Sequence, residues 1–167
     1  VGIEESEAPV VDWTTAWRTQ LRAHTVGLLT VTPPWLAAPF LPGRTIVIDP
    51  AMAFGTGDHA TTRGVLGLMQ DVVRPGDVVA DLGSGSGVLA IAAAKLGAAR
   101  VAAIESDGDA IGNAEENVAA NDVAGRVVVI EGDATVLLPL VAPVRVVLAN
   151  IISAVIRDLL PVVKQSL

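Results

Sequence analysis

A glycine-rich turn is the most specific chemical pattern in the sequence. Residues 81–87 read Asp-Leu-Gly-Ser-Gly-Ser-Gly and are followed by an apolar run typical of a helix. The alternating glycines let the backbone approach a ligand without an intervening side chain, and the N–H groups of the following helix can face an anionic group. Residues 85–90 also fit the looser G-x-G-x-x-A form of dinucleotide sites, so the turn alone leaves two nucleotide-type ligands open.

Polar residues at successive predicted strand ends narrow the choice of ligand. Glu105 lies 22 residues after Gly83, where a carboxylate can accept two hydrogen bonds from a ribose diol, a position that also serves NAD. Asp133 could accept from an exocyclic amine such as that of adenine. Asn150 can donate and accept at once, so it can orient an incoming amine. Asp81 would repel a pyrophosphate, but it suits the amino end of a zwitterionic amino acid.

A regular alternation of strands and helices must position these residues. The sequence predicts strands over 45–49, 78–82, 101–105, 127–131 and 144–149, and helices over 60–73, 86–97, 109–120 and 152–166. Strands separated by helices imply parallel pairing, and continuous apolar strands indicate a sheet that is covered on both faces. We therefore predict a doubly wound α/β fold, in which ligands bind at the carboxyl ends of the strands.

The segment before this alternation is predicted to be a separate N-terminal piece. Asp12 can cap a linker helix that runs to about His24, and a short strand over 26–31 ends at the proline pair that begins with Pro33. Residues 1–44 form this segment in our prediction, and residues 45–167 form the ligand-binding domain.

Composition excludes several classes of protein. The 167 residues fit one domain, and 51% hydrophobic against 17% charged residues indicates a folded core. Without cysteine and with two histidines, disulfide scaffolds and thiolate chemistry are excluded and no metal site is expected. The net charge of −7 disfavours nucleic-acid binding and suits a cationic ligand or a basic partner. Because the apolar run over 88–94 is too short to span a bilayer, we predict a cytoplasmic protein without membrane contact.

The strand-end residues taken together resemble class I methyltransferases that use S-adenosylmethionine. A second segment, residues 53–62, reads Ala-Phe-Gly-Thr-Gly-Asp-His-Ala-Thr-Thr. With residues 87–98 and 149–151, it is similar to the ribosomal protein L11 methyltransferase family. The resemblance covers about residues 12–167. It departs from the family pattern at Asp58 and Ala60, where the family commonly has threonine and proline.

The resemblance implies a class I, Rossmann-like methyltransferase domain that binds S-adenosylmethionine. In the family, the positions of Thr62 and Gly83 contact the cofactor, Glu105 replaces the usual aspartate, and the loop from Phe54 to His59 covers the cofactor. Combined with the residue-level reasoning, the expected cofactor-binding residues are Phe54, Thr62, Asp81, Gly83, Gly85, Glu105, Asp133 and Asn150. We expect His59 to anchor the loop.

The implied reaction is methyl transfer to lysine side chains or the terminal amine of a large-subunit ribosomal protein, with Asn150 orienting the nitrogen. Three alternatives remain open: a small-molecule amine as acceptor, a cofactor-binding fragment without turnover, and an NAD-dependent oxidoreductase. The family has an amino-terminal docking domain that is not found before Asp12, and its sheet continues beyond Leu167. We therefore expect this chain to be part of a longer protein and to lack the last strands of the sheet itself.

Overall fold

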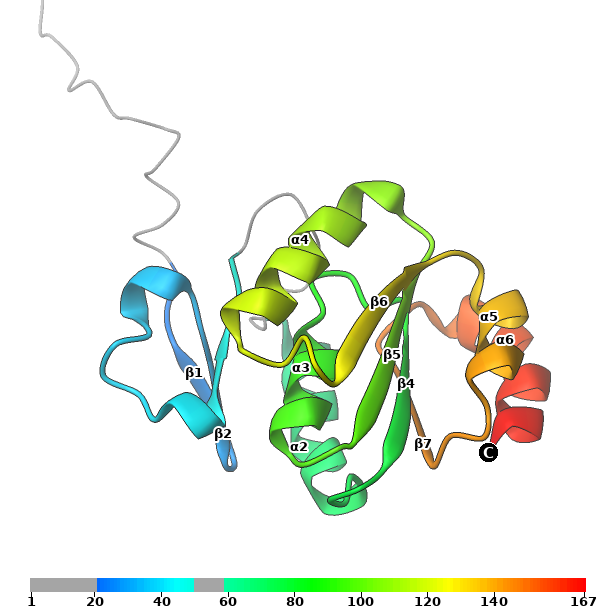
Figure 1. The fold of residues 1–167 in the computed structure, drawn as a ribbon, viewed down its shortest axis with the longest axis horizontal. Coiled ribbons are helices and arrows are strands. Elements are labelled where there is room, and N and C mark those ends of the chain that lie inside the picture. The colour runs from blue at the N-terminus through cyan, green and yellow to red at the C-terminus, as the bar shows by residue number, and fades with distance from the viewer. Residues whose placement is uncertain (1–20, 50–58) are drawn as a thin grey trace, which may run out of the picture.

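The computed structural model describes residues 21–49 and 59–167 (Figure 1). Its centre is a sheet of four parallel strands, β4 (Val78–Leu82), β5 (Arg100–Glu105), β6 (Val127–Glu131) and β7 (Val146–Ala149). Their spatial order is β6-β5-β4-β7. The chain therefore builds outward from β4 to β6 and returns to the other side of β4 for β7. A crevice is expected where this order reverses, at the carboxyl ends of β4 and β7.

Helices cover both faces of this sheet. On the side of the N-terminal strands lie α2 (Ala60–Val72), α3 (Val88–Lys95) and α4 (Gly108–Ala120), and on the opposite side lie α5 (Ala134–Val141) and α6 (Ser153–Ser166) (Figure 1). Within the described part of the chain, no helix has both the length and the apolar character needed to cross a membrane. The doubly wound α/β prediction is confirmed.

Side chains of strand β4 pack into the hydrophobic clusters on both sides of the central sheet. Val79 packs into the cluster formed with α2 and α3, while Ala80 and Leu82 pack into the cluster beneath α5 and α6. This alternation follows from the two-residue period of a strand. It also decides the direction of Asp81, which shares the face of Val79 and so points toward α3.

A smaller sheet precedes the central one. It consists of β1 (His24–Val26), β2 (Leu29–Thr32) and β3 (Thr45–Val47), with β1 antiparallel and β3 parallel to β2. The segment predicted over 45–49 is thus a strand, but it pairs with β2 rather than with the central sheet. This pairing joins residues on the two sides of the predicted boundary after residue 44.

The N-terminal predictions need two corrections. The single strand expected over 26–31 is a hairpin, because Gly27 takes a left-handed conformation (φ 57°) and turns the chain between β1 and β2. The helix expected to reach His24 does not do so, since residues 21–23 have no regular structure and His24 begins β1. The rest of that expected helix, residues 12–20, lies outside the described residues.

A glutamine of α2 holds the hairpin in place. The Nε2 of Gln70 donates to the carbonyl of Val26 (2.9 Å), and its Oε1 accepts from the N–H of Leu28 (2.7 Å). A side chain at Gly27 would collide with the amide of Gln70. The hairpin is therefore fastened to the same helix that begins at the edge of the crevice.

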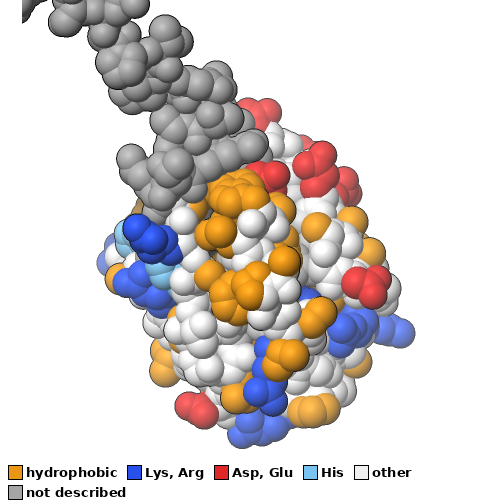
Figure 2. All heavy atoms as spheres, turned by 90° about the vertical axis from the view of Figure 1, so that its left-hand side faces the viewer, with side chains coloured by type: hydrophobic (Ala, Val, Ile, Leu, Met, Phe, Trp, Pro, Cys, Tyr) orange, Lys and Arg blue, Asp and Glu red, His pale blue; other side chains and the backbone are white. Residues whose placement is uncertain are grey.

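The connection between β2 and β3 carries exposed apolar side chains. It contains two short 3-10 helices, Pro34–Leu36 and Pro42–Arg44. Strand β2 ends just before Pro33, as the proline pair predicted. Trp35 and Leu41 are exposed, and Figure 2 shows hydrophobic side chains gathered over this end of the molecule. This connection adds little to the core, which lies between the sheets and α2 to α6.

Helix α5 was not predicted. It has eight residues and contains Pro139, which lacks the N–H needed for a helical hydrogen bond. Its start is fixed by Asp133, whose side chain accepts from the N–H of Thr135. The helices predicted over 60–73, 86–97, 109–120 and 152–166 and the four predicted central strands are present, with ends displaced by a few residues.

Candidate cofactor-binding site

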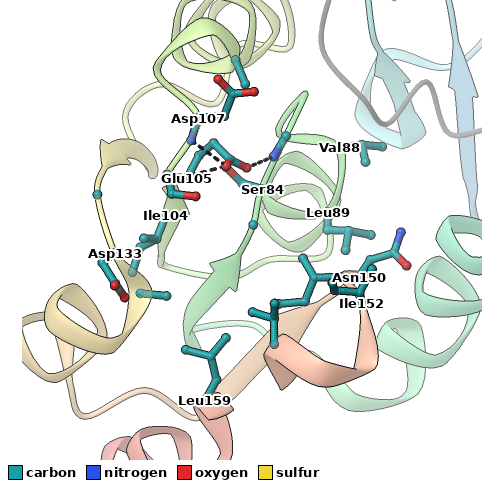
Figure 3. Close-up of a pocket in the computed structure, with 18 of the residues that line it drawn as sticks. Ser84, Val88, Leu89, Ile104, Glu105, Asp107, Asp133, Asn150, Ile152 and Leu159 are labelled. Carbon is teal, nitrogen blue, oxygen red and sulfur yellow. Dashed lines mark hydrogen bonds between the residues drawn. The ribbon is translucent and has the colours of Figure 1, made fainter. Parts of the chain in front are cut away.

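A cavity of about 800 Å³ lies at the carboxyl ends of the four central strands (Figure 3). Its walls come from the turn after β4, the ends of β5, β6 and β7, and the first turn of α2. Figure 3 shows Asp133 and Asn150 on opposite sides of the site. Six of the predicted site residues line it: Thr62, Gly83, Gly85, Glu105, Asp133 and Asn150. Phe54 lies outside the described residues.

The glycine turn forms one wall of the cavity, in a backbone conformation that residues with a side chain rarely adopt. The φ angles of Gly83, Gly85 and Gly87 are 70°, 51° and 80°, all in the left-handed region. The N–H of Gly83 donates to the carbonyl of Ile104 on β5 (2.8 Å). A Cβ on Gly83 would collide with the side chain of Ile151, so the turn and the end of β7 touch at this point.

Glu105 ties the end of β5 to the glycine turn. Its Oε2 accepts from the N–H of Gly85 (2.8 Å), and its Oε1 accepts from the N–H groups of Ser106 (2.8 Å) and Asp107 (3.0 Å). A carboxylate offers about four acceptor positions, so roughly one remains on Oε2. The side chain therefore shapes the site and retains capacity to accept one hydrogen bond from a ligand.

Asp81 lies outside the cavity lining. The side chain is 1% exposed between β4 and α3, where Oδ2 accepts from the N–H of Ala90 (3.0 Å) and Oδ1 has no hydrogen-bond partner. Burial raises the pKa of this carboxyl to about 7, and the charge of Glu105 acts in the same direction, while the bond from Ala90 opposes it. A direct contact between Asp81 and a ligand remains a prediction.

Asn150 is held by the first turn of α2. Its Nδ2 donates to the hydroxyl of Thr62 (3.0 Å), a side chain that is 1% exposed. The start of α2 is in turn capped by His59, whose ring accepts from the N–H of Thr61. Because one N–H of Nδ2 is engaged, the amide oxygen and the second N–H of Asn150 remain for a ligand.

Asp133 combines a structural bond with a place in the cavity wall. Its Oδ1 accepts from both the N–H and the hydroxyl of Thr135 (2.7 Å each) at the start of α5. Both bonds lower the pKa of the carboxyl, and the bond from the hydroxyl has the larger effect. The carboxyl is therefore ionised at neutral pH. Its Oδ2 remains as an acceptor, and the contact with an exocyclic amine stays a prediction.

The cavity is strongly acidic. Glu105, Asp107, Asp133 and Asp158 all line it, whereas no lysine or arginine among the described residues does. Such a lining attracts a cation and repels a pyrophosphate. This charge distribution weighs against the NAD alternative. Asp107 and Asp158 were not predicted from the sequence, although Asp107 stands two residues after the end of a predicted strand.

Two buried polar atoms have no hydrogen-bond partner within the described residues of this site, Oδ1 of Asp81 and Oγ of Ser84. Ser84 lines the cavity and is 6% exposed. Buried polar atoms nearly always have a partner, so water or a ligand is expected to supply one here. The sequence analysis did not single out Ser84, although it stands between two motif glycines.

Apolar side chains complete the cavity. Ile104 precedes Glu105 on β5, while Ile152, Val155 and Leu159 stand three or four residues apart along the start of α6. This spacing is the only sequence signal that could have identified the α6 side chains. In the ranges that the structure describes, no group of three His, Asp or Glu side chains could hold a metal ion.

Solved structures define the class of protein. The crystal structure of a ribosomal protein L11 methylase from Lactobacillus delbrueckii subsp. bulgaricus matches with a TM-score of 0.73 and 31% identity, covering 88% of this chain and 75% of that chain. An RNA methyltransferase from Salinibacter ruber, in complex with S-adenosyl-L-homocysteine, matches with a TM-score of 0.56 and 30% identity, covering 62% and 67%. The central sheet therefore has the Rossmann-like methyltransferase fold.

The sequence comparison is more specific. Residues 3–167 match the family described as ribosomal protein L11 methyltransferase (PrmA). A protein of that name from Desulfitobacterium hafniense is 44% identical over 156 residues, which cover 92% of this chain and 49% of that protein. The chain belongs to the ribosomal protein L11 methyltransferase family, as the sequence motifs predicted. It spans about half the length of the curated relatives it matches.

Proposed function

We propose that this chain binds S-adenosylmethionine and serves in methyl transfer to nitrogen atoms of ribosomal protein L11, on lysine side chains or the terminal amine. The observation that carries the proposal is the convergence of the glycine turn, Glu105 and Asn150 on one acidic cavity. Family membership favours the acceptor, since relatives bear that name. The Salinibacter ruber complex supports the choice of cofactor.

The residues present fit this cofactor. When bound, S-adenosylmethionine supplies an activated methyl group on a positively charged sulfur. The remaining acceptor positions of Glu105 and Asp133 suit the ribose and the adenine amine. The unpartnered Ser84 hydroxyl and the buried Asp81 carboxyl suit the polar amino acid end, which a water molecule could link to Asp81. We assign cofactor contact to Thr62, Gly83 and Gly85 by their positions in the lining.

Asn150 is proposed to orient the acceptor nitrogen. With Nδ2 committed to Thr62, its amide oxygen can accept an N–H of the incoming amine and so aim the nitrogen lone pair. Alignment of both reactants by the whole site can contribute roughly 7–11 kcal/mol of the barrier reduction, of which Asn150 would supply a part. A lysine amine has a reference pKa near 10.4 and must first lose a proton to solvent. Desolvation against Ile152 and Val155 would favour its neutral form.

The partner we propose is a basic ribosomal protein rather than nucleic acid. The net charge of −7 and the acidic lining favour a positively charged partner. A cytoplasmic location follows from this proposal, because ribosomal proteins are made and assembled there. Since the chain spans about half of its relatives, cofactor binding without turnover is a second candidate for the chain by itself.

Two measurements test these proposals. Calorimetry with S-adenosylhomocysteine and NADH in parallel should give binding of the first alone, and binding of NADH alone would overturn the cofactor assignment. Transfer of labelled methyl groups to purified ribosomal protein L11 should then be observed. Binding of S-adenosylhomocysteine without transfer to that protein would leave the cofactor assignment standing and favour the second candidate.

A further inference from the structure

Three asparagines stand one helical turn apart on α4. Asn113, Asn117 and Asn121 follow one another at four-residue spacing, so they share one face of the helix. Asn121 pairs with the backbone of Val47, where its Oδ1 accepts from the N–H (2.8 Å) and its Nδ2 donates to the carbonyl (2.6 Å). These are the two bonds that a neighbouring strand would make. The side chain of Asn121 thus takes the place of a neighbouring strand along the edge of β3.

Asn117 joins two segments that are distant in sequence. Its Oδ1 accepts from the N–H of Asp49 (2.9 Å), and its Nδ2 donates to the carbonyl of Ser86 in the glycine turn (3.0 Å). The side chain is 1% exposed. Of the three asparagines, it is the one that the structure bonds to the glycine turn. It therefore links the residues just beyond β3 to the wall of the cavity.

The bond to Ser86 bears on the shape of the turn. The peptide between Ser86 and Gly87 is fixed at both ends, because the N–H of Gly87 donates to the carbonyl of Ser84 (2.8 Å) and the carbonyl of Ser86 accepts from Asn117. Because Gly87 has no side chain, rotation of this peptide is less restricted on that side. Without Asn117, the carbonyl of Ser86 would lose this bond, and the peptide would be less firmly held in its present orientation.

We propose that Asn117 is a positioning residue for the cofactor site. It acts through the glycine turn and holds the backbone in the form that accepts the ligand, with Glu105 holding the N–H of Gly85 on the other side. The inference rests on the proposed function, because cofactor affinity is the property that it governs.

The test uses Asn117→Asp in the full chain, with Asn121→Asp as the matched control. The first substitution keeps an acceptor for the N–H of Asp49 but replaces the donor that faces the carbonyl of Ser86. The second makes the same exchange one turn later, where the replaced donor faces the backbone carbonyls of Val47 and Asn117 and not the glycine turn. We expect Asn117→Asp to raise the Kd for S-adenosylhomocysteine and the KM for S-adenosylmethionine at least about tenfold, with kcat at saturation little changed. Asn121→Asp should lower Tm while leaving both constants within about twofold.

A second readout is independent of the cofactor. In the ligand-free protein, the backbone amide resonances of Gly85 and Gly87 should shift in Asn117→Asp and remain in place in Asn121→Asp. If the wild type does not bind S-adenosylhomocysteine, the proposed function fails, and these resonances still decide whether Asn117 shapes the turn.

Two outcomes would overturn the inference. One is a folded Asn117→Asp variant with unchanged Kd and unchanged glycine resonances. The other is an equal rise of Kd in Asn121→Asp. Should Asn117→Asp fail to fold, Asn117→Ala removes the same donor without adding a charge, and its comparison with Asn121→Ala decides in the same way.

Discussion

The amide nitrogen of Asn150 donates a hydrogen bond to the hydroxyl of Thr62, which lies 88 residues earlier in the chain. The bond joins the end of β7 to the first turn of α2 and closes one side of the cavity. It also engages one N–H of the Asn150 amide, which leaves the amide oxygen and the second N–H for a ligand.

Replacing Asn150 by alanine should impair methyl transfer more than cofactor binding. Without its amide oxygen, the acceptor nitrogen is no longer aligned, and we expect kcat to fall by about 10- to 100-fold. Steady-state kinetics with ribosomal protein L11 and calorimetry with S-adenosylhomocysteine measure the two effects separately.

Thr62→Val supplies the control for this prediction. It keeps the size of the side chain but removes the hydroxyl that anchors Asn150. The expected loss in kcat is smaller than for Asn150→Ala, because the amide is still present but less firmly held. Unchanged methyl transfer in Asn150→Ala would show that the orienting role is wrong.

Gly83→Ala should destabilise the fold. The left-handed conformation (φ 70°) and the collision with Ile151 together are expected to cost about 2–4 kcal/mol in the free energy of unfolding. Gly112→Ala is the matched control: it lies in α4 with open space around it and should gain about 0.5–1 kcal/mol. Urea denaturation of both variants measures the difference, and equal stabilities would contradict the prediction.

Glu105→Gln should weaken both the fold and the site. An amide cannot accept at both ends, so either the N–H of Gly85 or those of Ser106 and Asp107 lose their acceptor. We expect a loss of about 1–3 kcal/mol in unfolding free energy, together with weaker binding of S-adenosylhomocysteine. Glu115→Gln removes the same charge from the exposed side of α4 and should change neither quantity. A Glu105→Gln variant as stable as Glu115→Gln would refute the bridging role.

Asp81 should make the ligand-free protein less stable as pH rises. Its pKa is raised from 3.8 to about 7 by burial, so the folded chain retains this proton at pH values where the unfolded chain has released it. The contribution of this group to stability is therefore lost progressively between about pH 4 and pH 7, by up to about 4 kcal/mol. Asp81→Asn should remove this decline. Denaturation at several pH values checks it, and a constant difference between variant and wild type would contradict it.

The central sheet could be predicted because its strands are continuous apolar runs that are bounded by glycine and polar residues. Those boundaries also located Glu105, Asp133 and Asn150, since parallel strands bring their carboxyl ends together. The position of Asp81 followed from the same pattern but was not recognised. In β4, Val79 and Asp81 share a face that turns toward α3, and Asp81 does not line the cavity.

The N-terminal strands could not be predicted in the same way. The pairing of β3 with β2 depends on tertiary packing, since local sequence does not specify the partner of a strand. The role of Asn117 was equally hidden. A polar residue on a helix is usually read as solvated, and only the structure shows that this one is buried against two backbone segments.

Helix α2 spans its 13 residues, or about 20 Å, between two attachments. Thr62 lies near one end and accepts a hydrogen bond from Asn150, and Gln70 lies near the other end and forms two hydrogen bonds with the hairpin. The hairpin and the cavity wall are thus attached near opposite ends of the same helix. A displacement of the hairpin is therefore expected to shift Thr62 as well, because both attachments belong to the same helix.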